Sequence, residues 1–215
     1  MRTREACGLL GPVVGTYRVL TPAGARMAGG LYSESEFDLA PVAALRDQMV
    51  ELGRSCTDPA WRSGGAIMLL WASLGDFMQR NRLRWTIGCA SVPMHDGGHA
   101  AASLWRHLRD THLAAPEWQV RPLLPLPVEH LDDTLPAQTP PLIKGYLRCG
   151  AKVLGPPAWD PDFGTADLPM LMDLEALPDS YRRHFLGTSS APELRPGAVK
   201  QGQERRAQPM RRAGS

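Results

Sequence analysis

The sequence ELGRSCTDPAWRSGGAI, residues 51–67, decides how the rest of the chain is arranged. Strand-forming residues precede and open it, and its Arg-Ser-Gly-Gly turn leads into a stretch with helical periodicity. The apolar residues of one helical face recur at i, i+3, i+4 and i+7: Ile67, Leu70, Trp71, Leu74, Phe77 and Met78. A strand, a glycine turn and a helix together predict an anion site, because the first N–H groups of a helix lack partners and glycine admits a close approach. An ordinary strand–helix connection is the alternative.

The turn resembles the pyrophosphate-binding motif of the GNAT acyltransferase superfamily, with Ile67 in the place of the second glycine. Further blocks resemble one branch, the ornithine Nα-acyltransferases that start ornithine-lipid synthesis. That branch is often labelled hemolysin-like and is related to acyl-homoserine-lactone synthases. The resemblance covers residues 13–186 and rests on these blocks in order: YSESEFD (32–38), ELGRSC (51–56), IGCASV (87–92), and PLIKGY through WDPDF (141–163).

The resemblance implies an α/β fold, the α+β mixed sheet of the GNAT N-acyltransferases. Only residues 1–12 precede the first strand that we expect, whereas the family has a further strand and helices there. We therefore expect a GNAT-like domain over residues 1–187 that is N-terminally incomplete, followed by a disordered basic tail over residues 188–215. Contact of this tail with an anionic membrane is the alternative.

Periodicity and turn residues predict the other elements. The expected strands are residues 13–20, 84–92, 120–127 and 168–174, and the expected helices are residues 41–46, 96–112, 141–153 and 178–185.

Composition places the chain among cytoplasmic globular proteins. No apolar run approaches the ~20 residues that span a bilayer, and the four cysteines lack the paired spacing of a disulfide framework. The net charge of +2 is uneven, because the residues from Pro192 onward carry +4 and the body carries −2. The body therefore gives no reason to expect a nucleic-acid partner. We expect a cytoplasmic protein, with peripheral contact at the inner face of the membrane as a further possibility.

The resemblance implies transfer of a 3-hydroxyacyl group from acyl carrier protein to the α-amine of L-ornithine. The acyl-carrier thioester is a substrate, and we expect no cofactor. The attacking amine arrives as an ammonium and needs a base, and Glu51 on the strand ahead of the anion turn is the expected catalytic residue. A salt-bridged strand carboxylate is the alternative.

The remaining expected site residues fall into three groups. The donor phosphopantetheine would be held by the anion turn: Arg62, Ser63, Gly64, Gly65 and Ala66. The acceptor's ammonium groups would be neutralised by the acids Glu34, Glu36 and Asp38. Its carboxylate would be bound in a fork by Arg54 or Arg18. The carrier protein or lipid headgroups would meet a basic stripe on one helix: Lys144, Arg148 and Lys152. The alternatives are a solvated acidic loop and a solvated basic face.

Two other motifs are better explained by structural roles than by catalysis or metal binding. Cys56 and Cys89 lack a histidine nearby in sequence, so packing is favoured over an acyl-enzyme. His95 and His99 flank a capping Asp-Gly-Gly turn, and we expect no metal there. Two alternative functions remain open. One is acylation of another amino acid or a homoserine-lactone-type acceptor, and the other is an inactive domain that binds carrier protein or membrane.

Overall fold

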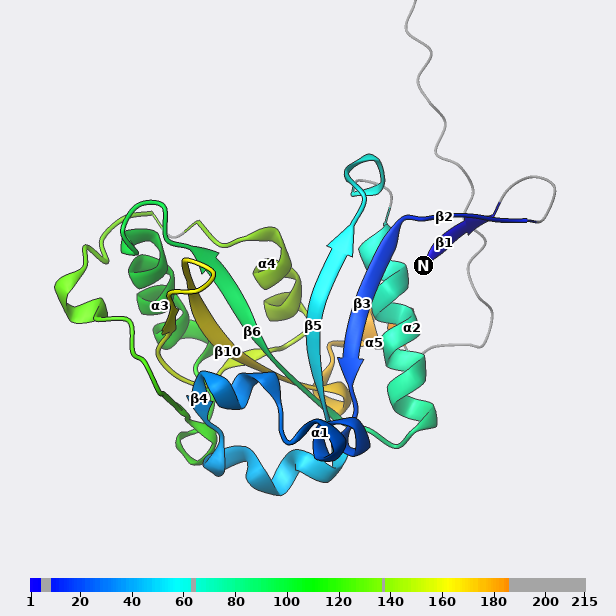
Figure 1. Cartoon of the computed structure of the whole chain (residues 1–215), viewed down its shortest axis with the longest axis horizontal. Coiled ribbons are helices and arrows are strands. Elements are labelled where there is room, and N and C mark those ends of the chain that lie inside the picture. Colours follow the sequence, from blue (N-terminus) through cyan, green and yellow to red (C-terminus); the bar gives the residue numbers. More distant parts are fainter. Residues whose placement is uncertain (5–8, 63–64, 137, 186–215) are drawn as a thin grey trace, which may run out of the picture.

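The computed structural model describes residues 1–4, 9–62, 65–136 and 138–185. Within these residues a six-stranded sheet has the order β3-β5-β6-β10-β8, and β9 pairs with β10 (Figure 1). The strands are β1 (Arg2–Arg4), β2 (Leu10–Val13), β3 (Gly15–Leu20), β4 (Phe37–Asp38), β5 (Met49–Thr57), β6 (Trp85–Pro93), β7 (Arg121–Pro122), β8 (Lys152–Val153), β9 (Ala158–Asp160) and β10 (Thr165–Asp173).

Five α-helices and six 3-10 segments connect these strands in the described residues. The α-helices are α1 (Pro22–Ala28), α2 (Ala66–Arg80), α3 (His99–His112), α4 (Pro141–Arg148) and α5 (Asp179–Phe185). The 3-10 segments are η1 (Tyr32–Ser35), η2 (Ala40–Gln48), η3 (Pro59–Trp61), η4 (Pro116–Trp118), η5 (Val128–His130) and η6 (Leu174–Ala176).

The centre of the sheet opens between β5 and β6. These two strands are parallel and pair over only three residues, from Met49–Trp85 to Glu51–Ile87, although each strand is nine residues long. Figure 1 shows the two strands spreading apart beyond that point. The β3–β5 register shifts by one residue where Arg54 adopts a φ of 53°, which marks a β-bulge in β5.

The sheet has two different faces because strand side chains alternate. Glu51, Cys89 and Asp167 point to the face on which η1 and η2 lie. The opposite face packs under α2, α3 and α4, where buried apolar side chains from β6 and β10 meet the helices (Figure 1). The polar face and the helical face are therefore separate environments on either side of the same opening.

Most elements follow the sequence prediction. The helix after the anion turn is α2, and the strands at residues 84–92 and 168–174 are β6 and β10. The closing helix at residues 178–185 is α5, and the first strand of the sheet is β3 with β2 directly before it. The expected tail over residues 188–215 lies outside the described residues.

The prediction of one helix over residues 141–153 is wrong. Helix α4 ends at Arg148, because Gly150 adopts a φ of 85° and the N–H groups of Gly150 and Ala151 return to the carbonyls of Leu147 and Tyr146. This pattern is a Schellman cap. Lys152 consequently lies on β8, so Lys144, Arg148 and Lys152 do not form one helical stripe.

The prediction of a strand over residues 120–127 is also wrong. Only Arg121 and Pro122 pair with β4, since the three prolines in this segment supply no N–H group for a ladder. The sequence interpretation also missed α1, although Thr21 at its N-cap accepts a hydrogen bond from the Gly24 N–H and Pro22 occupies its first turn. No helix of the described residues is both long and apolar enough to cross a bilayer.

Candidate active site

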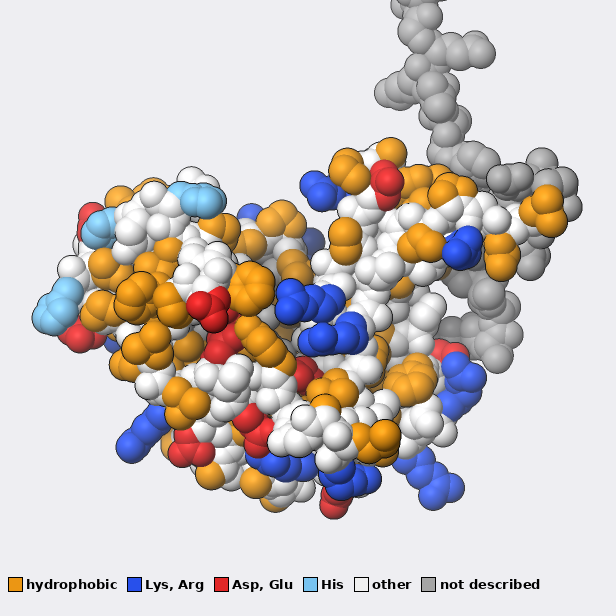
Figure 2. Space-filling model, viewed as in Figure 1, with side chains coloured by type: hydrophobic (Ala, Val, Ile, Leu, Met, Phe, Trp, Pro, Cys, Tyr) orange, Lys and Arg blue, Asp and Glu red, His pale blue; other side chains and the backbone are white. Residues whose placement is uncertain are grey.

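A pocket of about 250 Å³ opens on the polar face where β5 and β6 separate. We call it the polar pocket. Charged side chains of both signs gather near this opening, as Figure 2 shows over β5 and its neighbours. The lining residues that matter below are Arg18, Tyr32, Glu51, Arg54, Cys89, Asp160 and Asp167.

Two arginines supply the positive charge of the polar pocket. Arg18 comes from β3, and its guanidinium lies across Gly53, where an added Cβ would be 3.4 Å from Nη2. Arg54 projects from the bulge in β5 and lies over the Phe163 ring, 5.6 Å from its centroid. Both arginines that the sequence offered as alternatives for the acceptor's carboxylate therefore line one pocket, and their role in binding stays a prediction.

Glu51 lies beneath the pocket and is only 3% exposed. Its carboxylate accepts three hydrogen bonds, from the Tyr32 N–H at 2.8 Å, the Ser33 N–H at 2.7 Å and the Ser33 hydroxyl at 2.6 Å. These bonds fix η1 against β5. They also leave little of the carboxylate's acceptor capacity for a substrate proton.

Glu36 and Asp167 bring two carboxyl groups together at the other side of the pocket. Both Oε atoms of Glu36 are buried and make no hydrogen bond among the described residues. Burial and then the charge of Asp167 raise the pKa of Glu36 to about 7. Asp167 is 3% exposed and accepts a hydrogen bond from the Thr165 hydroxyl at 3.2 Å. A carboxyl group with a pKa near neutrality is suited to exchange protons at physiological pH.

Cys89 lies next to these acids but is held as a neutral thiol. Burial, and then the charge of Glu36, raise its pKa well above the ordinary value. Its Sγ donates a hydrogen bond to the Ser33 hydroxyl at 3.4 Å. This environment opposes the thiolate that an acyl-enzyme would require. The environment of Cys89 thus agrees with the packing interpretation.

The other two acids of the predicted cluster lie outside the polar pocket. Glu34 accepts the Leu31 N–H at 2.7 Å and forms a salt bridge with Arg46. Asp38 is exposed and accepts the Ala40 N–H at 3.0 Å. Of the three acids that the sequence placed together, Glu36 alone faces Asp167. Asp160 and Asp167 were missed, although an acid within the apolar run of β10 is a recognisable signal of a buried polar role.

The predicted donor turn lies at the start of α2. Gly65 is the N-cap residue with a φ of 75°, Ala66 is buried, and Arg62 is exposed with its Nε donating to the Thr57 carbonyl at 3.4 Å. Ser63 and Gly64 lie outside the described residues. A Cβ added at Gly65 meets nothing within 4 Å, so its backbone conformation rather than lack of space favours glycine there. The binding of a phosphate by this turn stays a prediction.

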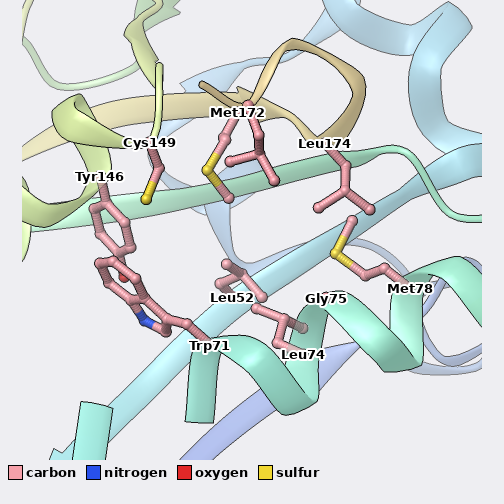
Figure 3. A pocket seen from close by; sticks show the side chains of 10 residues that line it. Leu52, Trp71, Leu74, Gly75, Met78, Tyr146, Cys149, Met172 and Leu174 are labelled. Atoms are coloured by element: carbon pink, nitrogen blue, oxygen red, sulfur yellow. The ribbon is translucent and has the colours of Figure 1, made fainter. Parts of the chain in front are cut away.

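Two small apolar cavities of about 20 and 30 Å³ lie on the helical face of the same opening. Leu52, Tyr146 and Met172 line both of them. Figure 3 shows the first cavity, where Tyr146 stacks on Trp71 with a centroid distance of 5.4 Å. The Tyr146 hydroxyl is hydrogen bonded to that of Tyr17 on β3. Leu52 also lines the polar pocket, so the apolar cavities and the polar pocket meet at this residue.

The predicted basic surface is divided between two elements. Lys144 and Arg148 are exposed on α4, and Lys152 is exposed on β8. At the other turn considered from sequence, His99 Nδ1 accepts the Asp132 N–H at 2.9 Å, which gives this histidine a structural partner. The absence of a metal there stays a prediction.

Comparison with known proteins first defines the class. Residues 2–72 match the acetyltransferase (GNAT) domain family, and the mixed sheet that opens between β5 and β6 has the GNAT fold. Among solved structures, an aminoglycoside 6'-N-acetyltransferase complexed with coenzyme A is 14% identical with a TM-score of 0.43, covering 83% of this chain and 73% of that one. A CoA-dependent acyl-homoserine lactone synthase, MesI, is 12% identical with a TM-score of 0.41, covering 88% and 80%.

Curated relatives then define the family. An L-ornithine N(alpha)-acyltransferase of Rhodobacter capsulatus is 33% identical over 80% of this chain and 69% of its own length. Proteins of the same name from Agrobacterium fabrum and Brucella abortus are 34% and 32% identical over 81% and 80% of this chain. The chain belongs to the L-ornithine N(alpha)-acyltransferase family. It spans 63% and 65% of the length of the Agrobacterium and Brucella relatives.

Proposed function

We propose that this chain transfers a 3-hydroxyacyl group from acyl carrier protein to the α-amino group of L-ornithine. The observation that carries the proposal is the polar pocket, which has arginines on one side, carboxyl groups on the other and the opening of the sheet between them. The names of the relatives support ornithine as the acceptor. The acyl donor is inferred from the resemblance in sequence.

The acceptor fits the charge distribution of the polar pocket. The α-carboxylate of an amino acid is suited to Arg18 and Arg54, since guanidinium groups bind carboxylates with paired N–H donors. The two ammonium groups of ornithine are suited to the acidic side, where Asp160 and Asp167 line the pocket beside Glu36. A neutral acceptor would leave these carboxyl groups without a partner, which is costly in a pocket of this burial.

The donor fits the part of β5 beyond Glu51. From Leu52 onward β5 has no partner on the β6 side, so its backbone groups on that edge are available to the amide groups of a pantetheine arm. The apolar cavities around Leu52 and Tyr146 lie next to this edge, and at about 20 and 30 Å³ they would have to widen by movement of their lining side chains to take an acyl chain. Arg62 and the start of α2 would take the phosphate, and Lys144 and Arg148 would attract the acidic carrier protein.

The decisive experiment is product analysis by mass spectrometry with the purified 215-residue chain. With ornithine and a 3-hydroxyacyl carrier protein, we expect a single product acylated on the α-nitrogen. Putrescine lacks the carboxylate and 5-aminopentanoate lacks the α-amine, and neither should be acylated at a comparable rate. Replacing Arg18 and Arg54 together by alanine should raise the KM for ornithine at least ~10-fold.

Several outcomes would contradict the proposal. Acylation of the δ-nitrogen, faster acylation of homoserine lactone than of ornithine, or equal use of a coenzyme A thioester would each change the assignment of acceptor or donor. Binding of acyl carrier protein without any product from any of these amines would instead favour the carrier-binding function.

A further inference from the structure

We propose that Glu36 and Asp167 form a carboxyl pair that takes the proton from the acceptor's ammonium group, and that Glu51 positions this pair without exchanging protons itself. This inference rests on the proposed amine acylation, and it assigns the base of that reaction to residues other than the one that the sequence favoured. The evidence for this inference is the arrangement of the carboxyl groups in the polar pocket.

The backbone holds the two carboxyl groups in fixed positions on separate elements. Glu36 follows η1, and its carbonyl accepts the Leu123 N–H at 2.7 Å. Asp167 lies within the nine-residue ladder between β10 and β6. Carboxylate oxygens of Glu36 and Asp167 and the Sγ of Cys89 lie within 4.8 Å of one another. Two ionised carboxylates at such a separation repel each other, so the pair favours a state in which it holds one proton.

The burial of Glu36 is unusual for a carboxylate that has no structural task. Its two Oε atoms are hidden from solvent and accept no hydrogen bond from the described residues. A buried polar atom without a partner is costly, and such groups persist where function requires them. The ammonium of an acceptor in the polar pocket would supply the missing donor. Glu51 is buried as well, but three donors from η1 already occupy its carboxylate.

The charged and titratable groups around Glu36 come from several strands and from η1, and some of them raise or lower its pKa as follows. Asp167 from β10 and Asp160 from β9 raise its pKa by their negative charge, and the nearby Tyr32 hydroxyl lowers it. Cys89 from β6 is neutral, as its own raised pKa requires. The carboxylate of Glu51 on β5 also faces the pocket, and Arg18 from β3 and Arg54 from β5 supply the positive charges on the opposite side.

The proton balance of the reaction follows from this arrangement. With both carboxyl groups ionised, Glu36 accepts one proton from the α-ammonium and shares it with Asp167. The free amine then forms the C–N bond at the thioester carbonyl, and the C–S bond breaks as the tetrahedral intermediate collapses. The thiolate takes the second proton from the same nitrogen, and the carboxyl pair returns its proton to solvent.

The first test measures the pair in the free chain and does not depend on any activity. We expect the isotope-labelled carboxyl carbon of Glu36, followed by NMR, to titrate near pH 7. In the Asp167→Asn variant its titration should move down by about one pH unit or more, because the like charge is removed. A Glu36 carboxyl that titrates at its ordinary value in the unaltered chain would overturn the proposal, as would an unchanged titration in Asp167→Asn.

The second test compares pH–rate profiles. Glu36→Gln should lower kcat/KM by ~10²-fold or more and remove its acid limb, and Asp167→Asn should move that limb to lower pH. Glu51→Gln should lower kcat/KM but leave the pH of the acid limb unchanged, since this substitution weakens only the hydrogen bonds that hold η1. Glu117→Gln changes an exposed acid that does not line the polar pocket and serves as the matched control.

The two tests separate this inference from the proposed function. If Glu51→Gln removes the limb and Glu36→Gln keeps it, Glu51 is the base and the inference is wrong while the acyltransferase stands. If the NMR titration is as expected but the chain acylates no amine, the proposed function fails and the carboxyl pair has no substrate to act on, which also ends its assignment as a base.

Discussion

At the scale of single residues, the polar pocket contains groups that do not favour the folded state. Glu36 is a carboxyl group with a raised pKa, and Arg54 has a left-handed backbone conformation without being glycine. Such features cost stability and tend to concentrate at functional sites. The effect of each feature on the stability of the folded state can be measured separately from its effect on catalysis.

The raised pKa of Glu36 gives a stability prediction with a definite sign. Between its ordinary value of 4.5 and about 7, the folded state binds more protons than the unfolded state, so the free energy of unfolding falls as pH rises through this window. Glu36→Gln removes this loss. It should stabilise the chain by about 1 kcal/mol above pH 7, since solvent screens part of the repulsion, and the gain should vanish below about pH 4, where Glu36 is protonated in both states. Urea unfolding at both pH values tests this, with Glu117→Gln as control; an equal gain at both would contradict it.

Arg54 offers a matched pair of variants. Arg54→Gly and Arg54→Ala both delete the guanidinium, but only glycine accepts a φ of 53° without strain. Arg54→Gly should therefore be more stable than Arg54→Ala by about 1 kcal/mol, while both raise the KM for ornithine equally. Thermal unfolding and steady-state kinetics check the two halves of this prediction. Equal stability of the two variants would show that the bulge relaxes, and unequal KM values would show that backbone strain contributes to binding.

At the scale of elements, the helical face depends on how closely α2 and α4 approach. Gly145 of α4 lies against the Trp71 ring of α2, and a Cβ there would be 2.5 Å from its Cη2. The same tryptophan stacks on Tyr146, whose hydroxyl meets that of Tyr17. Three elements thus meet in one aromatic cluster beside the opening of the sheet.

Gly145→Ala should separate α4 from α2. The added methyl group must displace a large ring that is held by stacking, and we expect a loss of about 1–3 kcal/mol of stability, as for other overpacked cores. Chemical denaturation followed by far-UV circular dichroism measures the loss, and near-UV circular dichroism reports the altered tryptophan. Lys144→Ala, on the exposed side of the same helix, is the control and should change stability by less than ~0.5 kcal/mol. A neutral Gly145→Ala would show that the ring moves freely.

At the scale of the whole molecule, the distribution of positive charge bears on the carrier protein. Lys144 and Arg148 are exposed on α4 near the apolar cavities, whereas Lys152 lies on β8. A fixed helix presents its charges in one geometry, which an acidic partner can recognise. Substitutions on α4 and on β8 can therefore test which of the two basic surfaces binds the carrier protein.

Reversing Lys144 and Arg148 together to glutamate should raise the KM for acyl carrier protein at least ~10-fold, or about 1.4 kcal/mol. Lys152→Glu should change it less than ~3-fold on the same scale. Steady-state kinetics at constant ionic strength measures both. A larger effect of Lys152→Glu would place the docking surface over β8, and no effect of either would remove α4 from the carrier interface.

The sequence predicted the strand–turn–helix unit and the central strands because periodicity and turn residues act locally. The sequence-based prediction failed where contacts between distant segments determine the structure. The acids at Glu34, Glu36 and Asp38 are close in sequence, but the tight 3-10 turn sends them to different neighbours. Asp167 joins Glu36 only through the pairing of β10 with β6, which no local pattern contains. Lys152 lies outside the helix because the cap at Gly150 ends α4 before it, although the spacing of the charges suggested a longer helix.

The three-residue ladder between β5 and β6 has a mechanical consequence. It is the place where the β3–β5 half of the sheet is hydrogen bonded to the larger half formed by β6, β8, β9 and β10. Beyond it, side-chain packing rather than backbone pairing sets the angle between the halves. Leu52 and Met172 line both cavities beside this opening, so we expect their volumes to influence how far the halves can swing apart. Amide hydrogen exchange should therefore be fastest along the free edge of β5 and slowest in the β6–β10 ladder.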